Sequence, residues 1–296
     1  MLPARPVHLP SRPPVRAVAA ATLLAAALGG CSSTEPTPAV GAEVSAAPAL
    51  QLTHVHGAAF DPGDGALLLA THHGLLEVAD GEPAEVGPVL DLMGFTVAGP
   101  GHYLASGHPG LHVDLPQPVG LIESTDGGRT WTPVSRQGQS DFHALTVSDT
   151  GVLGYDGTLI ASPDGEAWAP LIIPAEPHTL AAAPDGGQVL ATTARGLLRS
   201  PDGGASWLPV EGAPLLQVVT WADGATAVGV DPAGTLWTST DAAGSGQEGP
   251  QLGSPPQAVA ATPVATGEEL RIAVVTAEAV LESRDGGRTF TEALSD

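Results

Sequence analysis

The sequence contains no lysine, and its ten basic residues are all arginine, against 32 aspartate and glutamate residues. Three of the arginines, Arg5, Arg12 and Arg16, lie in residues 1–30, a segment without acidic residues. The rest of the chain therefore carries seven cations against 32 anions, a formal charge of −25. Such a charge repels phosphate groups, which excludes a nucleic-acid partner.

Cysteine and aromatic residues are also scarce. A single cysteine excludes a disulfide framework and any cysteine-rich metal or iron–sulfur site. Glycine and proline are instead abundant, at 38 and 29 residues, while hydrophobic residues make up 43% of the chain. This combination favours a globular all-β chain with many tight turns over a disordered one.

Residues 17–28 form an unbroken apolar run that is too short for a membrane span of about 20 residues. A basic segment precedes the run, and Gly29, Gly30 and Cys31 follow it, as in a secretory signal peptide. Leu28-Gly29-Gly30-Cys31 resembles the lipobox of bacterial lipoproteins, which implies that a diacylglyceryl group is attached to Cys31. The alternative is an ordinary secreted protein whose cysteine happens to follow the apolar run.

The chain divides into three parts on this interpretation. Residues 1–30 are the lipoprotein signal peptide, and residues 31–50, which have no periodicity and few large apolar groups, are a flexible tether to the membrane. Residues 51–296 form the folded domain. We therefore expect an extracytoplasmic protein that is anchored to the cell membrane by lipid on Cys31.

One sequence motif recurs through the folded domain. Its fullest copy, STDGGRTW, occupies residues 124–131, and further copies lie at 162–168, 200–207 and 283–290, with a degenerate copy at 239–244 and a vestige at 79–81. The aspartates of the five copies follow one another at spacings of 38, 38, 39 and 44 residues. A period near 40, with four short strand-like runs in each unit, is typical of β-propeller blades.

The motif is suited to a hairpin turn, because its aspartate can accept hydrogen bonds from backbone N–H groups and its glycines adopt positive φ. It resembles the Asp-box, or BNR repeat, of sialidases, sortilin-type receptors and photosystem assembly factors. The chain also resembles actinobacterial envelope lipoproteins labelled as sialidases or glycosyl hydrolases. The resemblance implies structural roles for Asp126, Trp131, Asp164, Trp168, Asp202, Trp207, Asp285 and Phe290. It indicates a fold, which can host many functions.

The strand-like runs predict an all-β propeller of six four-stranded blades. The blades are expected at residues 54–89, 91–134, 141–171, 178–210, 216–252 and 257–294. A seventh blade would need the residues that we assign to the tether.

Histidine gathers on one face of the predicted propeller. In each blade the chain runs from an innermost to an outermost strand, so the connections between blades share a face with the loops between second and third strands. We call this the front face; the repeated turns lie on the back face. Nine histidines follow the signal peptide, and eight map to the front face of the first four blades, whereas His102 maps to the back.

Two interpretations of the front-face histidines remain open. Imidazole is the commonest transition-metal ligand, and copper or zinc would suit these side chains, with Met93 as a further soft ligand for copper. The candidate metal ligands begin the innermost strands and are His54, His56, His143 and His178. Alternatively, these histidines hydrogen-bond loops, or the face binds a small molecule, a glycan or a peptide through His72, His73, His108, His112 and Arg195.

The number and positions of the arginines argue against sialidase chemistry. The resemblance would require three arginines around the substrate carboxylate, whereas only Arg195 is expected at the front face. Another glycosidase needs two carboxylates about 5–9 Å apart, for which the candidates are Asp91, Asp114 and Asp141. We therefore expect a ligand-binding envelope propeller, with a glycoside hydrolase as the alternative. A purely structural scaffold would not explain why histidines gather on one face.

Overall fold

A computed structural model gives the structure of the chain and describes residues 54–79, 81–184, 186–264 and 269–295. The signal peptide, Cys31, the tether and Asp80 of the vestigial repeat lie outside the described residues. Within the described ranges every regular element is a strand, and no helix there is long and apolar enough to cross a membrane.

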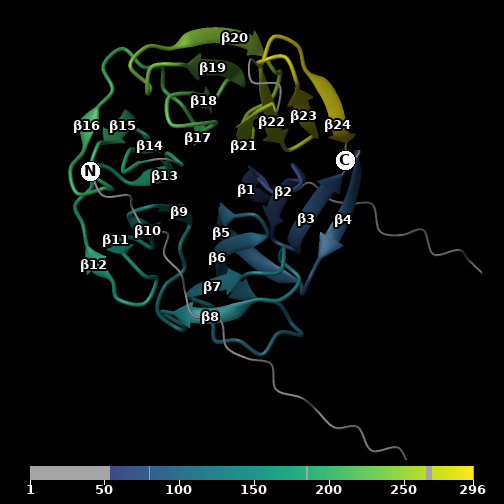
Figure 1. Cartoon of the computed structure of the whole chain (residues 1–296), viewed down its shortest axis with the longest axis vertical. Helices are drawn as coiled ribbons and strands as arrows, with labels where there is room; N and C mark the ends of the chain where they lie inside the picture. Colours follow the sequence, from purple (N-terminus) through teal and green to yellow (C-terminus); the bar gives the residue numbers. More distant parts are fainter. Residues whose placement is uncertain (1–53, 80, 185, 265–268, 296) are drawn as a thin grey trace, which may run out of the picture. The chain divides into compact units, whose positions relative to one another are not determined.

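The strands form six antiparallel sheets, or blades, and each blade is built from four consecutive strands (Figure 1). Blade 1 contains β1 (Val55–Phe60), β2 (Leu67–Thr71), β3 (Gly74–Ala79) and β4 (Glu82–Val86). Blade 2 contains β5 (Leu90–Gly99), β6 (His102–Pro109), β7 (Leu121–Ser124) and β8 (Thr132–Ser135). Blade 3 contains β9 (Ala144–Ser148), β10 (Gly151–Tyr155), β11 (Leu159–Ser162) and β12 (Ala169–Pro170).

The remaining blades repeat this order. Blade 4 contains β13 (Pro177–Ala182), β14 (Val189–Thr193), β15 (Gly196–Ser200) and β16 (Leu208–Pro209). Blade 5 contains β17 (Val218–Trp221), β18 (Ala227–Val230), β19 (Thr235–Ser239) and β20 (Gln247–Gln251). Blade 6 contains β21 (Pro256–Pro263), β22 (Leu270–Thr276), β23 (Ala279–Ser283) and β24 (Thr291–Ser295). The predicted six-bladed propeller is confirmed, and no strand extends more than one residue beyond its predicted blade.

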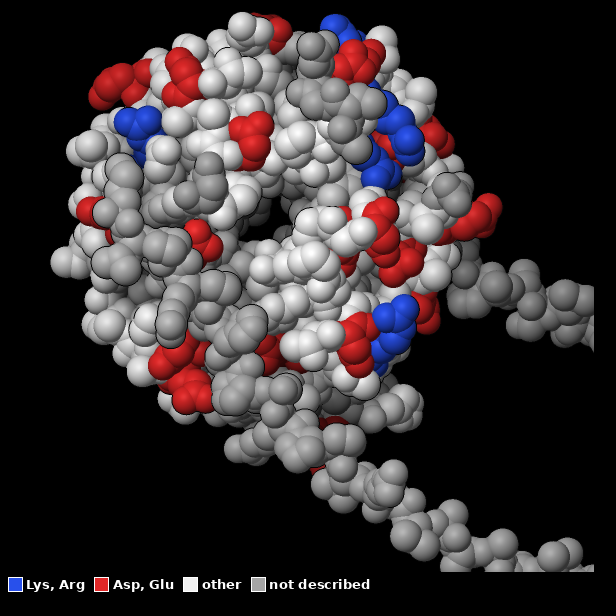
Figure 2. All heavy atoms as spheres, in the orientation of Figure 1, with Lys and Arg blue, Asp and Glu red and all other residues white. Residues whose placement is uncertain are grey.

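The first strands of the blades form a closed inner ring. Each of β1, β5, β9, β13 and β17 contacts the next innermost strand, and β21 returns to β1. A central opening remains inside this ring (Figures 1 and 2). On the face seen in Figure 2, acidic side chains are spread around the ring, and basic side chains occupy fewer places.

The hydrophobic core is divided into six clusters, one between each pair of neighbouring blades. Strand β2 shows why, since successive side chains of a strand point to opposite faces of its sheet. Leu67 and Leu69 pack against blade 6, whereas Leu68 and Ala70 pack against blade 2. Burying one leucine contributes about 1.5–3 kcal/mol, so sheets buried on both faces hold the ring together.

Blades 1 and 6 join the two ends of the propeller without sharing a strand. The backbone N–H of Val55 donates to Gln257 Oε1 at 2.7 Å. Arg271 of β22 donates to Gly65 O at 2.5 Å, and its guanidinium lies 4.4 Å from the ring centre of Phe60. Side chains therefore close the ring, in addition to the apolar cluster between these blades.

The repeated motif forms the turn between the third and fourth strands of a blade. In the fullest copy, Asp126 accepts hydrogen bonds from the Ser124 hydroxyl at 2.9 Å, the Thr130 N–H at 2.9 Å and the Thr130 hydroxyl at 2.6 Å. The Thr130 hydroxyl is the main cause of a lowered pKa at Asp126. The carboxylate thus satisfies donors of its own turn, which is a structural role.

The degenerate copy folds in the same way despite its sequence. Asp241 accepts from the hydroxyl and the N–H of Ser245, both at 2.8 Å, and these bonds lower the pKa of Asp241 to about 2. Ala242 adopts a φ of 58° where the fullest copy has Gly127 at 75°. A left-handed conformation costs a residue with a Cβ roughly 1–2 kcal/mol, so this turn carries strain that the glycine copies avoid.

Replacing Ala242 by glycine and Gly127 by alanine should change the free energy of unfolding in opposite directions. We expect Ala242→Gly to raise the free energy of unfolding by about 0.5–1 kcal/mol, since relief of strain exceeds the entropy that glycine adds to the unfolded chain. Gly127→Ala should lower it by about 1 kcal/mol, because the added Cβ meets only the flexible end of Arg129. Urea unfolding of both variants measures the two changes. A loss of stability in Ala242→Gly would contradict this account of the turn.

Candidate functional site

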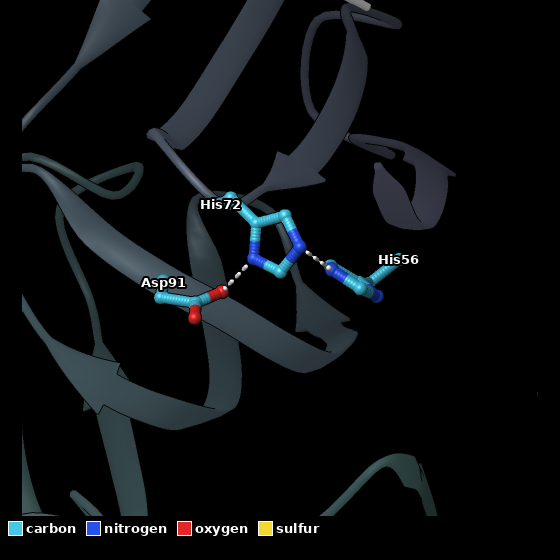
Figure 3. Close-up of side chains that lie close together, drawn as sticks. All are labelled: His56, His72 and Asp91. Atoms are coloured by element: carbon cyan, nitrogen blue, oxygen red, sulfur yellow. Dashed lines mark hydrogen bonds and ion pairs between the residues drawn. The ribbon is translucent and has the colours of Figure 1, made fainter. Parts of the chain in front are cut away.

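Six side chains from blades 1, 2 and 3 form a continuous chain of contacts at the front face. We call this group the His–Asp cluster: His56, His72, Asp91, His108, Asp141 and His143. In order, the joining distances are 3.3 Å (Nε2 to Nε2), 2.6 Å (Nδ1 to Oδ1), 3.2 Å (Oδ2 to Nδ1), 3.2 Å (Nε2 to Oδ2) and 2.9 Å (Oδ2 to Nε2). Figure 3 shows the first three residues, with the His72 ring between Asp91 and His56.

Blade 1 places three histidines together through its hairpin. Val55 pairs with Thr71, so the next residues outward, His54 and His72, lie opposite each other. Their ring centres are 5.0 Å apart. The register shifts between Val55 and Gly57, and this irregularity brings the His56 ring to 4.5 Å from His72. Bulges of this kind often redirect side chains near functional sites.

Blade 2 contributes a cross-strand pair, Asp91 of β5 and His108 of β6. Gly107 precedes His108 and has a φ of 144°. A Cβ on Gly107 would lie 2.0 Å from the backbone oxygen of Asp91, so only glycine lets β6 approach β5 this closely. The carboxylate of Asp91 then accepts from two imidazoles, one at each oxygen.

Blade 3 contributes Asp141 and His143, on either side of Phe142. The Phe142 side chain is fully buried, and its N–H donates to the Ser106 hydroxyl at 3.0 Å. Neighbours one residue before and after an inward side chain share the opposite side of an extended chain, which lets Asp141 contact His143. The Oδ1 atom of Asp141 is buried and has no hydrogen-bond partner among the described residues.

The cluster remains partly open to solvent. Exposed fractions of the His72, Asp91, His108 and Asp141 side chains lie between 24% and 35%. Burial, and then the proximity of His72, lowers the pKa of His56 to about 4. His56 is therefore neutral at physiological pH and keeps a lone pair on one ring nitrogen.

The other blades carry different residues at the position that His56 occupies in blade 1. The equivalent residues at the start of the other innermost strands are Met93, His143, His178, Gln217 and Gln257. The two glutamines join neighbouring blades, since Gln217 Nε2 donates to Pro256 O at 2.6 Å and Gln257 Oε1 accepts from Val55 N. Blades 5 and 6 thus use this position for structure, whereas His56 contacts another imidazole.

The position of His72 shows the same contrast. It follows Thr71, whose hydroxyl donates to Gly74 O at 2.9 Å and holds the turn between β2 and β3. Thr193 and Thr276 make the same bond in blades 4 and 6, at 2.8 and 3.1 Å, and are followed by Ala194 and Ala277. The turn therefore does not need an imidazole at this position.

The structure brings some of the candidate residues from the sequence together in one cluster and leaves others outside it. His54, His56 and His143, predicted as metal ligands, lie in or beside the cluster, together with His72 and His108 from the predicted ligand-binding set and Asp91 and Asp141 from the predicted carboxylates. In the described part of the chain, five candidates have no hydrogen bond or ion pair to the cluster: His73, His112, Asp114, His178 and Arg195. Their roles stay predictions. His102 lies at the opposite edge and contacts Glu123 at 2.7 Å.

Sequence reasoning did not find the pairing of His56 with His72. The available signal is the spacing of a short hairpin, in which residues before the first strand and after the second lie side by side. The irregularity at His56 is a three-dimensional feature that this spacing does not show.

No protein-family model matches the sequence, and no curated protein matches it. Among solved structures, the chain is similar to the GH74 enzyme of Niastella koreensis, with a TM-score of 0.57 and 15% identity over 82% of this chain and 45% of that one. An ancestral GH74 enzyme gives a TM-score of 0.53 and 12% identity over 80% and 37%, and U3-55K gives 0.51 and 10% over 82% and 81%. These likenesses show the fold alone. The chain spans less than half of either GH74 enzyme.

The lowered pKa of His56 predicts a specific pH dependence. An unfolded histidine titrates near 6.5, so between pH 6.5 and 4 the unfolded state takes up a proton that folded His56 does not. Through this residue, stability should fall as the pH is lowered over that range. Thermal unfolding should therefore show a smaller loss for His56→Gln than for the wild type.

Nuclear magnetic resonance tests the same shift directly. The imidazole resonances of His56 should titrate with a midpoint near 4. In His72→Ala the midpoint should rise, because a repelling neighbour is removed, yet stay below 6.5 because burial persists. A midpoint at 6.5 in the wild type would contradict the burial of His56.

Proposed function

We propose that this protein is a lipid-anchored envelope protein whose propeller binds a ligand at the front face, with the His–Asp cluster at the centre of the binding surface. The observation that carries the proposal is the cluster itself. Its side chains come from three blades and are partly exposed. His56 and His143 occupy a position at which blades 5 and 6 carry structural glutamine, and His72 one at which blades 4 and 6 carry alanine.

Exposed apolar side chains give independent support. In the part of the chain that the structure describes, the large exposed hydrophobic residues are Val89, Leu111, Ile172, Leu208 and Leu215. All except Leu208 lie in front-face segments, either between blades or between β6 and β7. Leu111 is fully exposed, at 101%. Four of the five exposed apolar side chains thus share the front face with the His–Asp cluster.

Membrane anchoring follows from the lipobox-like segment before Cys31. We expect the mature protein to fractionate with membranes and to carry a diacylglyceryl group on Cys31, because lipid chains stabilise attachment by about 0.8 kcal/mol per buried CH₂. Mass spectrometry of the membrane fraction measures the modification, and Cys31→Ser should abolish it. An unmodified Cys31 thiol in the wild-type protein would contradict the proposal.

A glycoside hydrolase is the second candidate. It is favoured by the arrangement of Asp91 and Asp141, which lie at opposite nitrogens of the His108 ring, each 3.2 Å away. Glycosidases use two carboxylates on either side of the scissile bond. In this protein both carboxylates also contact other histidines, which favours a binding role over proton transfer to a sugar.

A thermal-shift panel tests front-face binding. The panel contains Zn²⁺, Cu²⁺, a set of mono- and disaccharides that includes a sialic acid, and short peptides. At least one class should raise the melting temperature, since a ligand that binds only the folded state stabilises it. The shift should be lost in His72→Ala and kept in the back-face control His102→Gln.

The competing outcomes of the panel are distinct. Absence of any shift, or an equal shift in His72→Ala, would contradict front-face binding. Turnover of chromogenic glycosides that Asp141→Asn abolishes would favour the hydrolase instead.

A further inference from the structure

We infer that His56 and His72 bind a zinc-type divalent metal ion through their Nε2 atoms, with Asp91 orienting His72 and at least one coordination position open to solvent. This inference rests on the proposed function and names the ligand of the same site.

The distance between the two nitrogens is the first argument. His56 Nε2 and His72 Nε2 are 3.3 Å apart. Two histidine nitrogens bound to zinc at 2.0–2.1 Å lie about 3.3–3.4 Å apart when the metal is tetrahedral. Ligands at right angles, as in an octahedral or square-planar site, would lie about 2.9 Å apart. The separation of 3.3 Å, which is also that of a hydrogen bond between the two rings, equals the spacing of two ligands of a tetrahedral ion.

The second argument is the position of Asp91. Its Oδ1 lies 2.6 Å from His72 Nδ1, so this nitrogen donates its proton to the carboxylate and Nε2 keeps a free lone pair. A carboxylate behind a metal-binding histidine fixes the tautomer and the direction of the ring. Asp91 is itself held by His108 Nδ1 at its other oxygen, at 3.2 Å. Donor atoms of His56, His72 and Asp91 all lie within 4.8 Å of one another.

The surroundings indicate an open site. A structural zinc site is closed by four protein ligands, whereas a site that binds substrate or water keeps a position free. His54 is the nearest further imidazole, with its ring centre 5.0 Å from that of His72, and rotation of its exposed side chain would supply a third nitrogen. Because the cluster side chains are partly exposed, a remaining position is available to an exchangeable ligand from solvent.

The repeat supplies variants that separate metal binding from folding. His56→Gln and His72→Ala install residues that blades 5 and 6, or blades 4 and 6, carry at the equivalent positions. Both variants should therefore fold. His178→Gln is the matched control, because it makes the same change as His56→Gln at the same register position of blade 4.

Calorimetry with Zn²⁺ on the chelator-treated full chain is the first experiment. The wild type and His178→Gln should bind one equivalent, and His56→Gln and His72→Ala should lose this binding while keeping their melting temperatures in the presence of chelator. Asp91→Asn should weaken it about 10–100-fold, as expected for a residue behind the ligand. A wild type that binds no zinc, or a His56→Gln variant that binds as tightly as the wild type, would overturn the inference.

Substitution with Co²⁺ tests the geometry. A four-coordinate Co²⁺ ion absorbs visible light strongly, and added azide should shift the spectrum by occupying the open position. A weak, octahedral-type spectrum, or no response to azide, would overturn the proposed coordination. If a glycan or peptide binds at the front face and zinc does not, the metal assignment fails while the proposed function stands.

Discussion

The packing of neighbouring blades around a closed ring is the constraint on which the rest of the structure depends. In the described part of the chain, blades 1 and 6 share no strand. Contact between them relies on the apolar cluster, on Arg271 against Phe60, and on the Gln257 bond to Val55. Closure brings the innermost strands together at one mouth. Within the ring, β1, β5 and β9 lie side by side, so His56 and His143, which are 87 residues apart, belong to one network.

The repeat separates structural positions from variable ones. Turns between third and fourth strands hold their shape through an aspartate that satisfies its own donors, even where Ala242 must adopt a left-handed conformation. Starts of the innermost strands are less constrained. There, Gln217 and Gln257 tie blades together, whereas His56 and His143 present imidazoles to neighbouring side chains. The His–Asp cluster can therefore occupy the front face of three blades without loss of the fold.

The fold could be predicted from the sequence because the repeated motif marks each blade. Its central copies follow one another at a nearly constant number of residues. The front-face location of the histidines followed from the order of strands within a blade. The detailed partners did not, since they depend on features that no spacing records. The irregularity at His56 and the close approach of β6 at Gly107 are such features. His178 shares the register of His56, yet it has no hydrogen bond or ion pair with a cluster residue among the described residues. Ala194 occupies the position that His72 has in blade 1.

The most direct measurement is anomalous X-ray diffraction from crystals of the zinc-treated protein, recorded at energies above and below the zinc edge. The account predicts one anomalous peak between blades 1 and 2, within about 2.1 Å of the Nε2 atoms of both His56 and His72. An anomalous peak elsewhere on the molecule, or a fully occupied zinc ion that contacts neither nitrogen, would contradict this account.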